Sequence, residues 1–169
     1  MNNLESQPHI LIYTDGSCHG NPGPGGFAAT LRRITADGAE LKYRRVVGFE
    51  PDHTTNIPME MTAVASALGC LQAGEPLPVI VRPDLKLIYD AMTKWVPGWI
   101  ANGWRKGDGK SVSNCDLWKQ IITVAEGKTI IWDWVKGHAG GPRNEEVDHL
   151  AGKQTKLARS KAAEIMFAV

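Results

Sequence analysis

The sequence predicts a single α/β domain with a mixed sheet covered by helices. Two patterns carry this prediction. Short apolar runs rich in Ile, Val and Leu alternate with stretches whose apolar residues recur at helical spacing. Three strand-like runs also precede the first helix, which is typical of an antiparallel meander beside a parallel segment. The length of 169 residues fits one domain with its own hydrophobic core.

The expected strands are short and separated by turn-forming residues. The first, residues 10–14, ends at Asp15 and is followed by a Gly/Pro-rich stretch, residues 16–26, which we expect to be a loop. The other four strands are expected at residues 27–33, 41–49, 79–81 and 129–135.

Helices are expected where apolar residues recur every three or four positions. Thr54, Thr55 and Asn56 offer caps for the first, which Gly74 and Pro76 would end. The second would follow Asp84 and stop at Pro97. The remaining segments are expected to be a polar stretch at 98–113, a helix at 116–125, a loop at 137–142 and a long helix from 144.

We expect residues 1–8 to be a short N-terminal lead-in, 9–160 the folded domain, and 161–169 the end of a helix or a tail. The formal net charge is only +1, so any surface that binds nucleic acid must be a local basic patch. Neither a signal peptide nor a membrane span is indicated. Three widely spaced cysteines, Cys18, Cys70 and Cys115, suggest reduced thiols and a cytoplasmic protein, with a monomer as the default.

Four acidic residues stand where a site could form. Asp15 and Asp84 each follow a strand, and the carboxyl ends of parallel strands meet at one edge of a sheet. Glu60 and Asp148 lie in the first turns of two helices. Each acid alone has a structural explanation as a turn or helix-cap residue. Glu60, however, shares the inward face of its helix, and a buried carboxylate needs a partner or a metal.

Several clustered carboxylates would repel one another unless cations neutralised them. Hard oxygen ligands favour Mg²⁺, with Mn²⁺ as a possible substitute. Two such ions about 4 Å apart can activate water and stabilise the leaving oxygen in phosphodiester cleavage. The sequence therefore points to phosphodiester chemistry.

Several motifs, in consistent order from about residue 10 to 151, resemble those of type 1 ribonuclease H. The first is Tyr13-Thr14-Asp15-Gly16-Ser17-Cys18, followed by a glycine-rich stretch at 20–26. The later ones are Thr55-Asn56 with Met59-Glu60, Asn114 with Asp116-Leu117-Trp118, and Trp132 with Trp134-Val135-Lys136-Gly137-His138-Ala139-Gly140, then Asn144, Asp148 and Leu150-Ala151. The glycine stretch, the VKGHAG segment and four correctly ordered acids together make the resemblance specific.

The resemblance implies the ribonuclease H-like fold, a five-stranded mixed sheet of order 3-2-1-4-5 with helices on both faces. It implies an endoribonuclease that cuts the RNA strand of RNA–DNA hybrids by two-metal catalysis, leaving 5′-phosphate and 3′-hydroxyl ends. The two Mg²⁺ ions would be held by Asp15, Glu60, Asp84 and Asp148, with Asp15 shared between them. His138 would transfer a proton, since a nearby acid cluster favours a protonated imidazole. No obligatory protein partner is implied.

The same resemblance implies how the hybrid is bound. Contacts along the minor groove, where 2′-hydroxyls distinguish RNA from DNA, would come from Gly16, Cys18, Gly20, Asn21 and Asn56. Glu60 would also touch a 2′-hydroxyl. A DNA-strand phosphate would be held by Thr55, Asn21 and Asn114. Trp95 and Trp118 would line the DNA channel, and a protruding basic handle would carry Trp99, Trp104, Arg105, Lys106 and Lys110.

The sequence departs from the family at three places, one of which is a handle with fewer cations than strongly basic relatives carry. Ile57 replaces the second of two adjacent asparagines, and Pro58 follows it. Before Asp84 the usual Thr or Ser is Pro83, and after it the usual Ser-Gln is Leu85-Lys86. We expect Asp84 to keep its place while its surroundings change.

Three other interpretations are open. A catalytically weak module of the same fold could bind hybrids or RNA, although unused clustered carboxylates would cost stability. A related nuclease, such as a resolvase or a reverse-transcriptase nuclease domain, would share the fold. A small-molecule α/β enzyme is the third, but the sequence lacks a nucleotide-binding fingerprint and a nucleophile elbow.

Overall fold

The computed structural model describes residues 5–134 and 141–168. Within them, five strands form one sheet in the order β3-β2-β1-β4-β5. The strands are β1 (His9–Cys18), β2 (Gly23–Ile34), β3 (Glu40–Thr54), β4 (Val79–Pro83) and β5 (Ile130–Trp132). The helices are α1 (Asn56–Gly69), α2 (Lys86–Asp90), the π-helical turn η1 (Ala91–Trp95), α3 (Val96–Ala101), α4 (Cys115–Ala125) and α5 (Pro142–Phe167).

The sheet is mixed, as the sequence predicts. β1, β2 and β3 form an antiparallel meander, while β1 pairs with β4 and β4 with β5 in parallel. The predicted strand order 3-2-1-4-5 is confirmed. Because β1 and β4 are parallel neighbours, their carboxyl ends lie together, and Thr14 pairs with Pro83 in register.

The expected loop over residues 16–26 is wrong in extent. β1 continues past Asp15 to Cys18, and β2 begins at Gly23, so only residues 19–22 connect the two strands. Cys18 pairs with Gly25 and Ser17 with Gly26. Glycines signal a loop in sequence, but here they lie in a strand that other elements approach closely: a Cβ on Gly26 would meet the backbone of Thr155 in α5 at 2.4 Å.

Two predicted helix boundaries are also wrong. α1 ends at Gly69, several residues before Gly74. Pro97 does not stop the second helical segment, because α2, η1 and α3 follow one another to Ala101. Pro97 lies in the first turn of α3, where the missing N–H costs little. At the end of the chain, α5 continues to Phe167, so most of residues 161–169 is helix.

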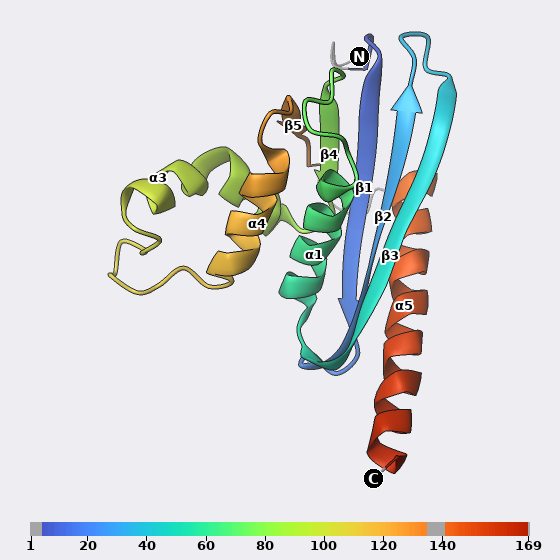
Figure 1. Ribbon diagram of the computed structural model, residues 1–169, viewed down its shortest axis with the longest axis vertical. Helices are drawn as coiled ribbons and strands as arrows, with labels where there is room; N and C mark the ends of the chain where they lie inside the picture. The colour runs from blue at the N-terminus through green and yellow to red at the C-terminus, as the bar shows by residue number, and fades with distance from the viewer. Residues whose placement is uncertain (1–4, 135–140, 169) are drawn as a thin grey trace.

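Two helical layers enclose the sheet (Figure 1). α1 and α4 cover one face, and α5 packs against β1, β2 and β3 on the other. α3 and the loop leading to α4 project to the left of the sheet. The main core, between the sheet and the α1 side, includes Ile12, Leu31, Val64, Leu68, Val81, Ile88 and Ile121. Under α5 a smaller cluster joins Ala28, Val147 and Ala151.

The lead-in before β1 is attached through an ion pair. Arg82 in β4 donates from Nη2 to Glu5 at 2.6 Å and from Nε to Asp133 at 2.8 Å.

Among the described helices, none combines the length and the apolar character needed to cross a membrane.

Candidate active site

Three of the four predicted acids meet at one edge of the sheet. Asp15 comes from β1, Glu60 from the first turns of α1, and Asp84 from the residue just after β4. Each offers a carboxylate oxygen, and these oxygens lie within 4.8 Å of one another. Asp15 and Glu60 are buried, at 7% and 5% exposed, while Asp84 is half-buried. The convergence expected from the strand ends is therefore present.

Gly16 makes this convergence possible. A Cβ at Gly16 would lie 2.3 Å from the backbone nitrogen of Glu60 and 2.5 Å from the carbonyl carbon of Met59. Since both atoms belong to the backbone of α1, only glycine lets β1 and α1 approach this closely. The approach places carboxylate oxygens of Asp15 and Glu60 within 4.8 Å of each other.

Asp15 and Glu60 form a pair of carboxyl groups whose ionised forms are disfavoured by burial and by neighbouring negative charges. Burial, and then repulsion from Asp84 and Asp148, raises the pKa of Asp15 to about 7. Burial and the charges of Asp15 and Asp84 raise the pKa of Glu60 well above its ordinary value. Without a cation the pair therefore keeps a proton near neutral pH, and a divalent ion would replace it.

The surroundings of one Glu60 oxygen indicate whether the site can accept a metal ion. Glu60 Oε2 is fully buried and has no hydrogen-bond partner among the described residues. Leaving a buried carboxylate oxygen unpaired costs free energy, and a hard cation would satisfy it. The donor set consists of carboxylate oxygens, which suits Mg²⁺ or Mn²⁺ and not a thiolate-seeking metal. The acids present therefore fit a divalent metal site.

Asp148 stands apart from the compact triad. It lies on the exposed side of the first turns of α5 and does not belong to the group of oxygens within 4.8 Å. Asp148 is nevertheless near enough for its charge to contribute to raising the pKa of Asp15. His138, the predicted proton-transfer residue, lies outside the described residues, as does the rest of the segment 135–140.

The departures around Asp84 have a structural explanation. The amide of Asp84 donates to Thr14 O at 3.3 Å, so the nitrogen of Pro83 points to the other side, where β5 has already ended at Trp132. Asp133, just after β5, still donates from its backbone nitrogen to Val81 O at 2.9 Å, so the parallel pairing of the two segments ends where Pro83 has no N–H to continue it. Trp134 donates from Nε1 to Asp84 O at 3.2 Å, and Lys86 Nζ lies 5.5 Å from the Trp134 ring centroid.

The turn after β1 contacts the start of α1. Asn21 Oδ1 accepts a hydrogen bond from the backbone amide of Asn56 at 3.0 Å. Thr55, predicted as a cap, occupies the N-cap position but makes no side-chain cap bond, so Asn21 supplies the cap from outside the helix. Asn56 and Gly20 are exposed at this edge. The structure thus brings four of the predicted minor-groove and phosphate residues together: Gly20, Asn21, Thr55 and Asn56.

Cys18 is held within the protein. Its thiol donates to Gly23 O and Thr54 O, both at 3.3 Å, and it is half-buried. This side chain ties β1 to the start of β2 and the end of β3. Any contact of Cys18 with substrate would therefore involve its backbone.

A groove of about 780 Å³ lies between α1 and the projecting handle. The predicted residues that line it are Trp95, Trp99, Arg105, Lys106, Asn114 and Trp118. Ile57 lines it too, which places this departure beside Asn114 and next to Asn56. The groove therefore connects the start of α1 with the basic handle.

The four handle-side tryptophans form a cluster around Trp99, but they differ in exposure. The Trp99 ring centroid lies 5.8, 6.2 and 5.6 Å from those of Trp95, Trp104 and Trp118. Trp95 is 41% exposed, whereas Trp118 is 2% exposed and donates from Nε1 to Ser113 O. Trp104 is not among the residues that line the groove. Trp118 thus serves mainly the core.

Among the groove residues that sequence reasoning missed are the polar residues Lys94 and Asn102. Lys94 also pairs with Asp90 at 2.7 Å, and Asp90 pairs with Lys86 as well. The available signal was the spacing of Lys86, Asp90 and Lys94, four residues apart on one helical face.

Known proteins resemble the chain over most of its length. The RNase H family model matches residues 7–156. A protein named Ribonuclease H from Nitrobacter hamburgensis is 43% identical over 159 residues, covering 94% of this chain and 99% of that protein. One from Thiobacillus denitrificans is 44% identical over 150 residues, covering 89% of this chain and 95% of that one.

Solved structures agree. A crystal structure of a type 1 RNase H with the type 2 active-site motif superposes with a TM-score of 0.74 at 34% identity, covering 88% of this chain and 74% of the other. An RNase H1 in complex with an RNA/DNA hybrid gives a TM-score of 0.64 at 24% identity, covering 88% and 98%. The second likeness concerns the fold alone. With its family-model match, its curated relatives and its strand order, this chain belongs to the RNase H family.

Proposed function

We propose that this protein is an endoribonuclease that hydrolyses the RNA strand of RNA–DNA hybrids and leaves 5′-phosphate and 3′-hydroxyl ends. The observation that carries the proposal is the acid triad of Asp15, Glu60 and Asp84, with Glu60 Oε2 lacking a partner among the described residues, in a chain of the RNase H family. The relatives named Ribonuclease H support the same reaction.

Asp15, Glu60, Asp84 and Asp148 would hold two Mg²⁺ ions, with Asp15 shared between them. When bound, the ions would supply the charge neutralisation and water activation that phosphodiester hydrolysis needs. The chain itself contributes the positions of the carboxylates: Gly16 fixes the distance between Asp15 and Glu60. His138 is proposed to move a proton to or from the reacting water or the leaving oxygen.

The substrate would lie across the turn after β1 and the start of α1. There Gly20, Asn21 and Asn56 would face the minor groove, while the groove beside the handle would take the DNA strand. Its exposed aromatic face and its cations suit a sugar-phosphate backbone. We propose that the protein acts as a monomer. Because its described cysteines are free thiols, we also propose a reducing, cytoplasmic environment.

The test is digestion of matched RNA–DNA, RNA–RNA and DNA–DNA duplexes with and without Mg²⁺. We expect cleavage of RNA only when it is paired to DNA, and only with Mg²⁺ or Mn²⁺ present. Product ends are read by ligation and phosphatase sensitivity. Hybrid cleavage that survives complete chelation by EDTA would contradict the two-metal mechanism. Binding of hybrid without any cleavage would favour a binding module.

A further inference from the structure

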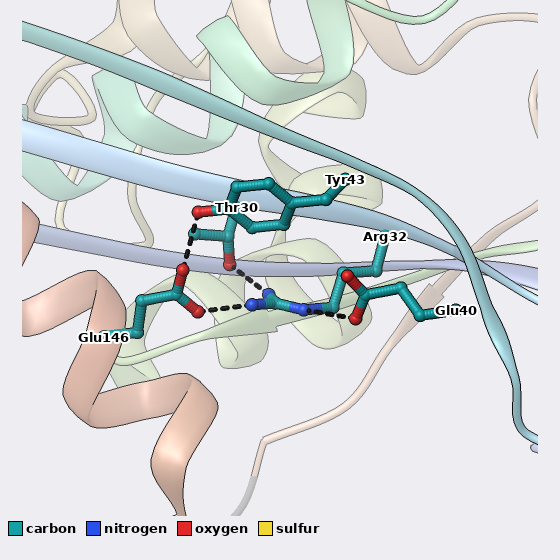
Figure 2. A network of polar contacts seen from close by, with 5 residues as sticks. All are labelled: Thr30, Arg32, Glu40, Tyr43 and Glu146. Atoms are coloured by element: carbon teal, nitrogen blue, oxygen red, sulfur yellow. Dashed lines mark hydrogen bonds and ion pairs between the residues drawn. The ribbon is translucent and has the colours of Figure 1, made fainter.

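A buried arginine on the sheet binds a glutamate near the start of α5 (Figure 2). Arg32 in β2 is 7% exposed and donates to Glu146 in α5 through Nη2. Its other donors reach Thr30 Oγ1 at 2.8 Å and Glu40 Oε2 at 3.0 Å. A buried guanidinium requires such partners, and three separate acceptors fix its orientation.

Glu146 has a second donor on the sheet. The Tyr43 hydroxyl, from β3, donates to Glu146 Oε1 at 2.6 Å. The Tyr43 ring also stacks over Arg32, whose Cζ lies 4.8 Å from the ring centroid. Both carboxylate oxygens of Glu146 are therefore held, one by each of two neighbouring strands. We call Arg32, Tyr43 and Glu146 the clamp.

The clamp attaches the N-terminal end of α5 to the sheet. The N-cap of α5, Gly141, provides no side-chain cap bond. Val147, one residue after Glu146, is fully buried and packs with Ala28 and Ala151, so apolar packing and the clamp together attach this end of the helix to the sheet. Asp148 follows two residues after Glu146 on the exposed side of the helix.

We propose that the clamp formed by Arg32, Tyr43 and Glu146 positions Asp148 toward the acid triad and thereby sets the affinity of the site for divalent ions. The inference rests on the proposed function, because it takes Asp148 as a metal ligand. Residues that orient metal ligands without touching the metal commonly change affinity by about 10- to 100-fold when removed. The clamp residues are positioning residues and contact neither metal nor substrate.

The test compares metal binding in clamp variants. Arg32→Met would leave two glutamates without their partner and could unfold the protein, so the main variants are Tyr43→Phe and Glu146→Ala, with Glu146→Gln as the conservative version. We measure Mn²⁺ affinity by electron paramagnetic resonance without substrate, and the Mg²⁺ midpoint and KM for hybrid cleavage. Glu146→Ala should weaken Mn²⁺ binding by about tenfold. Glu146→Gln should restore most of the affinity, and KM should stay unchanged.

Arg33→Met is the matched control. Arg33 neighbours Arg32 in β2 and pairs with the buried Glu75 at 3.2 Å; because successive side chains of a strand point to opposite faces, Arg33 lies on the face of the sheet away from α5. It should lower thermal stability while leaving Mn²⁺ affinity intact. If Tyr43→Phe and Glu146→Ala only lower stability as this control does, the clamp is structural and the inference is overturned. A wild-type protein that binds Mn²⁺ but cuts no hybrid would contradict the proposed function and leave the clamp result valid. A wild type that binds no Mn²⁺ would overturn both.

Discussion

Gly16 and Glu60 touch backbone to backbone: a Cβ on Gly16 would lie 2.3 Å from the Glu60 nitrogen. This contact sets the separation of β1 and α1, and with it the separation of two carboxylates that would otherwise repel each other. The acid site therefore depends on the absence of a side chain as much as on the acids themselves.

Gly16→Ala should damage both the site and the fold. Because the atoms it meets belong to the backbone of α1, the helix must shift, at a cost of about 2 kcal/mol in the free energy of unfolding. The shift should weaken Mg²⁺ binding and slow cleavage. Gly38→Ala is the control, because a Cβ added at Gly38 would have no neighbour within 4 Å. Its positive φ adds backbone strain of its own. Chemical denaturation and Mg²⁺ titration measure the two effects; a Gly16→Ala protein with unchanged Mg²⁺ dependence would contradict this argument.

Asp15→Asn should abolish turnover and stabilise the metal-free protein at alkaline pH. The pKa of Asp15 is raised to about 7, so between about pH 4 and 7 the folded state binds more protons than the unfolded state. Stability of the wild type therefore falls as pH rises through this window. Asparagine removes the charge, with an expected gain on the order of 2 kcal/mol at pH 8 in EDTA.

Thermal melts from pH 4 to 8 in EDTA check the sign. The two proteins should be similar at pH 4 and diverge upward, while added Mg²⁺ should stabilise the wild type more than the mutant. An Asp15→Asn protein that melts below the wild type at pH 8, or that still cleaves hybrid, would show that Asp15 is only a structural residue.

The sequence predicts the fold and the triad because each depends on local pattern. Apolar runs and their order predict five strands with an antiparallel meander, the family resemblance implies their order in the sheet, and strand ends place Asp15 and Asp84 together. The extent of β1 was not predictable in the same way, because the local glycine-rich pattern signals neither the pairing of Gly16 with Phe27 in β2 nor its close contact with α1. The Arg32 and Glu146 pair is likewise separated by 114 residues, and no local pattern signals it.

Two tryptophans that the sequence could not tell apart should separate by experiment. Trp95→Ala should raise KM for the hybrid with little change in stability, because this ring is 41% exposed in the groove. Trp118→Ala should instead cost about 3–5 kcal/mol in the free energy of unfolding, because its ring is 2% exposed in the core. Denaturant melts and steady-state kinetics of both variants distinguish the binding role from the core role. The reverse ranking would place Trp118 in substrate binding.

The last prediction concerns how the handle holds the hybrid. Arg105 and Lys106 are exposed and line the groove, and Arg105 Nη1 donates to Gly109 O at 3.0 Å, which leaves the rest of its guanidinium for a phosphate. Nonspecific affinity for nucleic acid scales with the number of phosphates neutralised, because each releases counterions. Replacing both residues with Ala should therefore raise KM and flatten the plot of log affinity against log salt by about 1.5. The rate at saturation should change little, because the acid triad is untouched.

A matched control removes the same charge elsewhere. Lys153 and Lys156 are exposed on α5, which covers the opposite face of the sheet from α1. Their double replacement with Ala should leave the salt slope and KM near wild-type values. Binding is measured by fluorescence anisotropy in EDTA, where no cleavage occurs, from low to physiological salt. If the two double mutants behave alike, the handle contributes only general charge, and the hybrid must be held mainly by the turn after β1 with Thr55 and Asn114.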